Sequence, residues 1–246
     1  MLITVVNKFG YDIVRSSNPA RNFHSSHYLR HNARRLEHLA SLRIPVSGMS
    51  VLEIGAGIGD HSHYYMDRGC ATTITDARPE NLNCLRERYP YHNVQFLDME
   101  CPSPVDGSPF DVVHCYGLLY HLKNPETALE FLSRSTKKML FLETCVSFGE
   151  AEALCPIEED RKDPSQAWSG TGCRPTRPWV FNRLQGLFEN VYVPKTQPNH
   201  EEFPLDWTAA EKHQNTYQRA MFIASHERLE NRMLVPSLLN EQARHY

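Results

Sequence analysis

The sequence predicts an α/β fold: a doubly wound, Rossmann-like, mostly parallel sheet with helices on both faces. Between residues 48 and 145, short apolar runs alternate with helical segments of about ten residues, the pattern of parallel strands joined by helices. The first run is followed by the glycine-rich stretch "EIGAGIG", and each of the next two runs leads into an aspartate. Glycines and acids at the carboxyl ends of parallel strands are typical of a ligand site.

The expected elements follow in a regular order. Ser25 and Ser26 can cap a first helix that runs to about Leu42 and carries leucines near one face. Pro79 suits the first turn of a later helix. The segments expected after the first helix are strand 50–54, helix 60–69, strand 71–75, helix 79–89, strand 94–97, strand 111–116, helix 125–136 and strand 139–144.

The alternation stops after residue 145. Residues 146–178 are rich in proline, glycine and charge without a clear period, and an irregular insertion of this length is usually functional or mobile. Order returns with a helix near 179–188 and strands at 190–194 and 219–225. The tail from 227 onward has no clear pattern.

Composition narrows the function classes. The net charge of −3 provides no overall positive field for polyanions, so binding of nucleic acid would need a local patch. Seven scattered cysteines without C-x-x-C spacing favour a reducing compartment over a disulfide framework or a zinc knuckle. The short apolar N-terminal run resembles no signal peptide, and no run of about 18 apolar residues exists. We therefore expect a cytoplasmic protein without a membrane partner.

The glycine-rich stretch predicts where the ligand binds. Gly55, Gly57 and Gly59 stand between a buried strand and the start of a helix, where the backbone can turn tightly and approach a ligand without a Cβ in the way. A turn of this kind can also be merely structural. Its place between strand and helix favours a nucleotide-type ligand.

Acidic residues around this turn indicate which nucleotide. Glu53 and Asp60 flank the glycines and would repel a pyrophosphate, but they suit a cationic or amino-bearing ligand. Asp76 ends the second strand and can accept from two ribose hydroxyls. Asp98 follows the third strand and can accept from an adenine amino group, with Met99 as apolar cover. Each aspartate alone could be a turn cap, but their recurrence at successive strand ends favours binding.

The stretches "VLEIGAGIG", "ITDARPENL", "FLDME" and "FDVVHCYGLLYHL", in that order, resemble the motifs of class I S-adenosylmethionine-dependent methyltransferases. The resemblance implies a seven-stranded sheet whose last strand, 219–225, is inserted antiparallel, with 190–194 as the sixth. It also implies S-adenosylmethionine as cofactor. The cofactor-binding residues on this likeness are Glu53, Gly55, Ala56, Gly57, Gly59, Asp76, Ala77, Asp98, Met99 and Cys115.

On this basis the chain is expected to form a single methyltransferase domain. Its parts are an N-terminal helical cover (1–47), the cofactor-binding core (48–145), a substrate-side insertion (146–178), the C-terminal part of the sheet (179–226) and a tail (227–246).

Histidines are the candidates for proton transfer. His121 lies just after the fourth strand, and an ordinary histidine titrates near neutral pH, so it is the best candidate for a general base. The alternative is a capping or packing histidine. His61 and His63 point apart if they lie on a helix, so we expect no metal site there.

Arginines offer candidate contacts to the substrate. Arg174 and Arg177, near Trp168 and Trp179, can hold a carboxylate, a phosphate or a ring, or can form a solvated surface pair. The first helix carries three further arginines, which either cover the donor site or lie on a solvated face: Arg30, Arg34 and Arg35.

A narrower likeness concerns the acceptor. "GLLYHLKNP", "FLETCVSFGE" and "QRAMFIAS" resemble segments of the tRNA wobble-uridine carboxymethyltransferase family, which uses carboxy-S-adenosylmethionine. On that likeness Tyr120 and Arg219 match contacts to the extra carboxylate, and Lys8 is a loose match for a third. This chain is shorter, lacks most of that family's N-terminal region and is slightly acidic.

Three functions follow from the sequence. The leading one is an S-adenosylmethionine-dependent methyltransferase with a small-molecule, sugar or glycan acceptor. The second is tRNA modification with the carboxylated donor, which makes tRNA a possible but less favoured partner. The third is a non-catalytic, cofactor-binding regulatory subunit.

Overall fold

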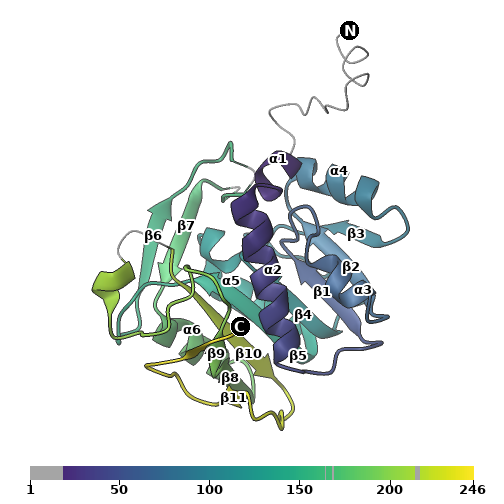
Figure 1. The fold of residues 1–246 in the computed structure, drawn as a ribbon. Helices are drawn as coiled ribbons and strands as arrows, with labels where there is room; N and C mark the ends of the chain where they lie inside the picture. Colours follow the sequence, from purple (N-terminus) through teal and green to yellow (C-terminus); the bar gives the residue numbers. More distant parts are fainter. Residues whose placement is uncertain (1–18, 164, 168, 214–216) are drawn as a thin grey trace.

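A computed structural model describes residues 19–163, 165–167, 169–213 and 217–246 of the chain. At its centre lies an eight-stranded sheet in the order β11-β8-β10-β5-β4-β1-β2-β3 (Figure 1). The strands are β1 (Ser50–Ile54), β2 (Ala71–Asp76), β3 (Asn93–Phe96), β4 (Phe110–Tyr116), β5 (Thr136–Cys145), β8 (Asn190–Pro194), β10 (Arg219–Ser225) and β11 (Leu234–Val235). The α-helices are α1 (Ala20–Phe23), α2 (Ser26–Ser41), α3 (Ser62–Met66), α4 (Pro79–Arg88), α5 (Pro125–Ser135) and α6 (Arg177–Gln185).

The strand directions confirm the expected α/β architecture. Strands β3, β2, β1, β4 and β5 pair in parallel, and β10 lies antiparallel between β5 and β8. The expected count of seven strands is wrong by one, because β11 pairs antiparallel with the outer edge of β8. This two-residue strand is too short to show a period in the sequence. It is held by the backbone pairing and by the buried side chain of Leu234.

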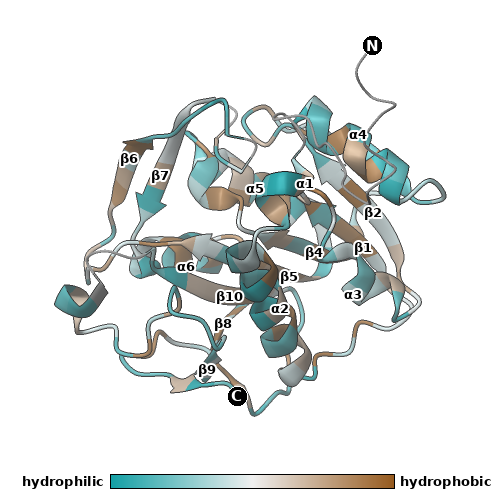
Figure 2. Ribbon diagram, turned by 45° about the horizontal axis from the view of Figure 1, so that its top comes forward, coloured by the Kyte–Doolittle hydropathy of each residue, from teal (hydrophilic) through white to brown (hydrophobic). Residues whose placement is uncertain are grey.

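Alternation along the strands separates two cores. On β5, Leu140 and Leu142 pack with α5 and α6, whereas Met139 and Phe141 pack on the opposite face with the C-terminal end of α2. Successive side chains of a strand point to opposite faces, so a continuous apolar run fills both layers. Figure 2 shows the apolar strands enclosed between the more polar helices.

Helix α2 crosses one face of the sheet and covers its central strands (Figure 1). As expected, Ser25 caps it, accepting a hydrogen bond from the Tyr28 amide. The leucines expected on one face of this helix differ in burial: Leu39 and Leu42 are buried, but Leu29 is 50% exposed. The other buried residues of the helix are polar and meet polar or charged groups of the sheet and its loops: His31, Arg35 and His38.

The insertion after β5 is more regular than expected. Strands β6 (Leu154–Glu158) and β7 (Thr171–Pro175) form an antiparallel hairpin, which packs near the 3₁₀-helix η2 (Leu119–His121). Two smaller strands, β9 (Thr196–Gln197) and β12 (Ala243–Arg244), pair in parallel, and η3 (Ala210–His213) is a second 3₁₀ turn. In the described part of the chain, no helix has the length and apolar character needed to cross a membrane.

Candidate active site

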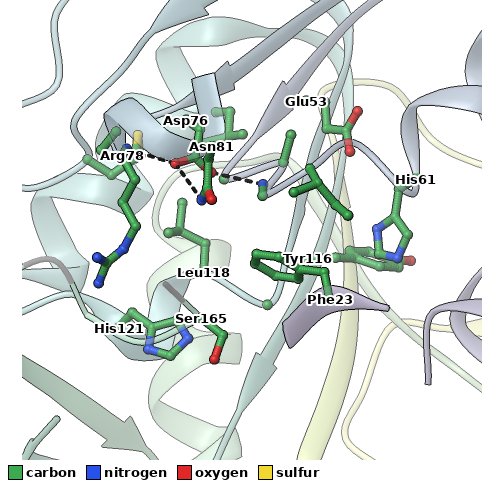
Figure 3. Close-up of a pocket in the computed structure, with 18 of the residues that line it drawn as sticks. Phe23, Glu53, His61, Asp76, Arg78, Asn81, Tyr116, Leu118, His121 and Ser165 are labelled. Carbon is green, nitrogen blue, oxygen red and sulfur yellow. Dashed lines mark hydrogen bonds between the residues drawn. The ribbon is translucent and has the colours of Figure 1, made fainter. Parts of the chain in front are cut away.

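A cleft opens at the carboxyl ends of β1, β2 and β4, the place predicted for the ligand (Figure 3). It holds about 1100 Å³ of space free of protein atoms, part of it open to solvent. The glycine turn and the ends of β2, β3 and β4 line it, together with α1, α2, η2 and the tip of the β6–β7 hairpin. Segments far apart in the sequence therefore meet around one cavity.

The three predicted glycines all have positive φ angles, but two of them line the cleft and the third packs against a side chain. A Cβ at Gly55 would lie 3.0 Å from the Leu118 side chain, and one at Gly57 would lie 2.9 Å from the Phe23 ring. Both of these glycines line the cleft. Gly59 does not: a Cβ there would lie 2.5 Å from the ring of Tyr89, which packs against it from behind. Its role is close packing of α4 against the turn.

Asp76 is fixed at the rim of the glycine turn (Figure 3). One carboxylate oxygen accepts from the Gly57 amide at 2.8 Å, and the other accepts from the Arg78 amide at 2.8 Å and from Asn81 Nδ2 at 3.1 Å. Burial raises the pKa of Asp76, and these hydrogen bonds act in the opposite direction. An ionised carboxylate can accept further hydrogen bonds, so it retains capacity for ligand hydroxyls.

Glu53 lies beside the glycine turn, as the sequence predicts, and lines the cleft. It is buried at the end of β1, and Ser62 Oγ donates to it at 2.5 Å. Burial raises its pKa to about 7. The carboxyl is therefore partly protonated near neutral pH, and a cation bound in the cleft would favour its charged form.

The other predicted cofactor residues divide between cleft and core. Asp98, Met99, Ala56 and Ala77 line the cleft, and Asp98 also accepts from the Glu100 amide at 2.9 Å. Cys115 does not line it: the side chain is buried in the apolar cluster shared with α5 and α6. The pleat of β4 directs it to that layer.

His121 and Glu159 form a pair on the wall of the cleft. His121 Nδ1 contacts a Glu159 carboxylate oxygen, which also accepts from the Ala167 amide at 2.7 Å. Burial lowers the pKa of His121, although Glu159 opposes this shift. Burial acts to raise the pKa of Glu159, but the contacts with His121, the Ala167 amide and the charge of Arg174 together outweigh it, and the pKa is lowered. Near neutral pH the imidazole is therefore neutral and its partner charged, with the ring proton on Nδ1 and the lone pair on Nε2.

Tyr120 and Arg219 meet at the same wall within a buried ionic network. Arg219 donates to Glu202 at 2.5 Å, to Glu143 at 3.1 Å and to the Tyr120 hydroxyl at 3.2 Å. Arg35 of α2 donates to the other oxygen of Glu143 at 2.6 Å. Both guanidinium groups line the cleft. Two cations and two anions thus balance one another.

The structure separates the two arginines of the insertion. Arg177 lies outside the cleft: it donates to the Leu239 carbonyl at 3.1 Å and stacks 3.9 Å from the centre of the Trp207 ring. Burial lowers its pKa to about 9. Arg174 packs behind the cleft wall, 4.9 Å from the centre of the Tyr120 ring. Neither lines the cavity, so the predicted substrate contacts are not brought together with the donor site.

The sequence also singled out two tryptophans beside these arginines and, as a loose match, one lysine near the N-terminus. Trp179 is buried in the core with α5 and α6. Trp168 and Lys8 lie outside the described residues.

His61 and His63 enter different environments, as their spacing predicts. His61 is buried, with Nδ1 3.2 Å from His114 Nε2 and Nε2 3.2 Å from Asn32 Oδ1. His114 Nδ1 in turn lies 2.8 Å from the Tyr65 hydroxyl. His63 is exposed, and its ring packs on Tyr89. Burial lowers the pKa of His114 to about 3, so this chain of rings is uncharged.

The sequence did not single out several residues around the cleft. Glu159 and Ser165 come from the hairpin of the insertion, and Phe23 and Tyr28 come from the N-terminal helices. These contacts join segments that are distant in the sequence, so no local sequence pattern predicts them. Of the three arginines of the first helix expected either to cover the donor site or to lie on a solvated face, Arg35 lines the cleft, whereas Arg30 and Arg34 pair with exposed glutamates.

Comparison with known proteins identifies the family of the chain. A family model described as a methyltransferase domain matches residues 25–191, more than half of the 246 residues. The tRNA U34 carboxymethyltransferase of Alteromonas mediterranea is 28% identical over 160 residues, which are 60% of this chain and 47% of that protein. The chain therefore spans about half the length of this relative.

Solved structures support the fold. The N-terminal domain of EvdMO1, crystallised in the presence of SAH and D-fucose, has a TM-score of 0.61 at 18% identity, covering 80% of this chain and 83% of that one. An S-adenosylmethionine dependent methyltransferase from Mesorhizobium loti has a TM-score of 0.56 at 16% identity, covering 80% and 99%.

A third structure has the same fold. The 1,6-didemethyltoxoflavin-N1-methyltransferase of Burkholderia thailandensis has a TM-score of 0.51 at 18% identity, covering 86% of this chain and 84% of that one. Because the methyltransferase-domain model covers most of its length, this chain belongs to that family, which confirms the enzyme class and the S-adenosylmethionine cofactor expected from the sequence.

Proposed function

We propose that the chain transfers a methyl group from S-adenosylmethionine to a nucleophilic atom of a small molecule, sugar or glycan, with His121 as the general base. The observation that carries this proposal is the His121–Glu159 pair on the wall of the cleft. Glu159 holds the proton on Nδ1, so Nε2 can accept a proton from a hydroxyl acceptor.

The cleft offers a place for each part of the cofactor. The turn at Gly55 and Gly57 would admit the methionine part, Asp76 would accept from the ribose hydroxyls, and Asp98 with Met99 would flank the adenine. When bound, S-adenosylmethionine supplies an electrophilic methyl group on a sulfonium centre. The residues around it position the two reactants, which is the main source of rate in an in-line displacement.

His121 would take the proton that the acceptor loses. When the acceptor oxygen bonds to the methyl carbon in place of the sulfur, the hydroxyl proton would move to His121 Nε2. The negative charge of Glu159 stabilises the resulting imidazolium. S-adenosylhomocysteine and the methylated acceptor are released, and the proton is then lost to water.

A small acceptor fits the surroundings of the cleft. Phe23 and Tyr28 of the N-terminal helices and Ser165 of the hairpin tip contribute apolar and hydroxyl surface to it. One structure of the same fold was determined in the presence of D-fucose and another with bound 1,6-didemethyltoxoflavin, and both are small ring compounds. These compounds support this class of acceptor.

Transfer to tRNA with the carboxylated donor is the second candidate, favoured by the contact between Tyr120 and Arg219 and by the curated relative. The charges weigh against it. Arg219 already faces the carboxylates of Glu143 and Glu202, so a further carboxylate would add a third anion to a balanced network. Titration calorimetry with both donors compares the two: we expect the uncarboxylated donor to bind at least as tightly.

The direct test uses methyl-labelled donor with panels of small-molecule, sugar and glycan acceptors. His121→Gln should lower the rate by about 10² to 10⁴-fold while leaving donor affinity within about threefold. The matched control is the exposed histidine His63→Gln, which should keep the wild-type rate. Full activity in His121→Gln would refute the general-base role. Donor binding without turnover on any acceptor would instead favour the non-catalytic regulatory subunit.

A further inference from the structure

Two overlapping groups of possible metal ligands lie beside the ionic network and outside the cleft lining: His31, His200 and Glu202, and His27, His200 and Glu201. His27 and His31 stand one turn apart on α2, and His200 and Glu202 come from the loop before β10. The ring centres of His31 and His200 are 4.7 Å apart, and His27 lies 6.0 Å from His31 and 5.3 Å from His200. The H-x-x-x-H spacing places both α2 histidines on one face of the helix.

Two nitrogens of this cluster are buried without a hydrogen bond among the described residues. They are Nε2 of His31 and Nε2 of His200, and the two residues are only 2% and 1% exposed. The nearest carboxylate oxygens are 3.7 Å from each, one on Glu202 and one on Glu201. Leaving buried polar atoms unsatisfied is costly, so their convergence on one point indicates a missing partner.

The spacing of the ligand atoms fits a metal ion. Two ligands about 2.1 Å from a tetrahedral zinc ion lie about 3.4 Å apart. Glu202 Oε1 is 3.2 Å from His27 Nε2, and Glu202 Oε2 is 3.7 Å from His31 Nε2. The ligand atoms of His31, His200 and Glu202 all lie within 4.8 Å of one another. Imidazole nitrogens with one carboxylate suit zinc and its neighbours rather than magnesium or calcium.

One carboxylate oxygen of Glu202 is available to a metal ion. Arg219 binds Oε2 of Glu202, so Oε1 faces His27 and is free to coordinate. The Glu202 amide donates to His200 Nδ1 over a long 3.3 Å. If His200 coordinates a metal through Nε2, its ring proton lies on Nδ1. Nδ1 can then no longer accept the hydrogen bond from the Glu202 amide, and this long bond is lost. Glu201, which pairs with Arg30, adds a second carboxylate at the edge.

We propose that His31, His200 and Glu202 bind one zinc ion, and that the exposed side chain of His27, 3.2 Å from Glu202 Oε1, turns in as the fourth ligand. The ion would fasten helix α2 to the loop before β10. The site does not take part in methyl transfer, because none of its four ligands lines the cleft. It is connected to the cleft through Glu202, Arg219 and Tyr120. A metal held there fixes the charged wall of the donor site and the helix that covers it.

The test measures metal binding in the full chain, independently of any methyl acceptor. After treatment with a chelator and its removal, ZnCl₂ alone should bind with a stoichiometry of one per chain and raise Tm by at least about 5 °C. Co²⁺ alone should give the visible absorption bands of a nitrogen- and oxygen-coordinated ion of low coordination number.

Two variants locate the site. His27→Gln removes an exposed ligand and should weaken zinc binding at least tenfold without unfolding the chain. His31→Gln should abolish the Co²⁺ bands. The matched control is His24→Gln, whose side chain is 51% exposed against 53% for His27, and it should bind zinc as the wild type does. No zinc uptake, or uptake unchanged in His27→Gln, would refute the site.

Discussion

At the residue scale, the sites of the molecule depend on side chains whose charge is set by burial. Desolvation raises the pKa of Glu53 and lowers the pKa values of His121 and His114, so it favours the neutral form of each side chain. For His121 the neutral form is the useful one, because a general base must accept a proton. The neighbour that keeps this imidazole oriented is Glu159, from the insertion.

The Glu159 side chain leads to a prediction about pH. The rate should fall as the pH is lowered through the pKa of His121, which burial places below the ordinary value of 6.5. Glu159 raises that pKa, so Glu159→Gln should shift the inflection to lower pH and reduce the plateau rate about tenfold or more. The measurement is a pH–rate profile under saturating donor. The control is Glu158→Gln, one residue earlier on the exposed hairpin, and an unshifted inflection in Glu159→Gln would contradict the pairing.

At the element scale, the turn after β1 shows how a glycine pattern divides into ligand and packing roles. Gly55 and Gly57 face the cleft, whereas Gly59 receives the ring of Tyr89 from behind. Tyr89 is buried and its hydroxyl donates to the Gly59 carbonyl at 2.6 Å, so the ring has no room to withdraw. The sequence pattern alone assigned all three glycines to the ligand.

This packing predicts the cost of a methyl group. Gly59→Ala should destabilise the fold by about 2 to 4 kcal/mol, from the strained backbone angle and from the clash with Tyr89 together. The control is Gly48→Ala, which has a similar φ of +72° but nothing within 4 Å of the new Cβ, so about 1 kcal/mol of strain is expected. Urea denaturation of both variants measures the difference, and equal losses would show that the contact with Tyr89 does not matter.

At the scale of the whole molecule, buried neutral histidines make stability depend on pH. The folded pKa values of His38 and His114, about 4 and about 3, lie below their unfolded value of about 6.5. The unfolded chain therefore binds protons first as the pH falls, and stability is lost below pH 6.5. Glu53, whose folded pKa is raised to about 7, acts in the opposite direction between pH 4.5 and 7.

The histidine effect can be isolated by comparison. Between pH 7 and pH 5, the wild type should lose about 2 kcal/mol more unfolding free energy than His114→Gln. A histidine that is protonated only in the unfolded chain lowers the unfolding free energy by about 1.4 kcal/mol for each pH unit below its unfolded pKa. Urea denaturation at both pH values, with chelator present, measures the two losses. His63→Gln removes an exposed histidine and should keep the wild-type dependence. Equal losses in wild type and His114→Gln would show that His114 is not kept neutral.

The sequence by itself determined the alternating strands and helices, the glycine turn and the acids at the strand ends, because each is encoded within a few consecutive residues. Asp76 and Asp98 could be placed at one edge because all parallel strands end there. Only the tertiary structure decided that Glu159 meets His121, that Arg177 turns away to Trp207, and that His27 meets His200. Such contacts depend on how distant segments pack against one another, and the periodicity of residues within one segment does not determine this packing.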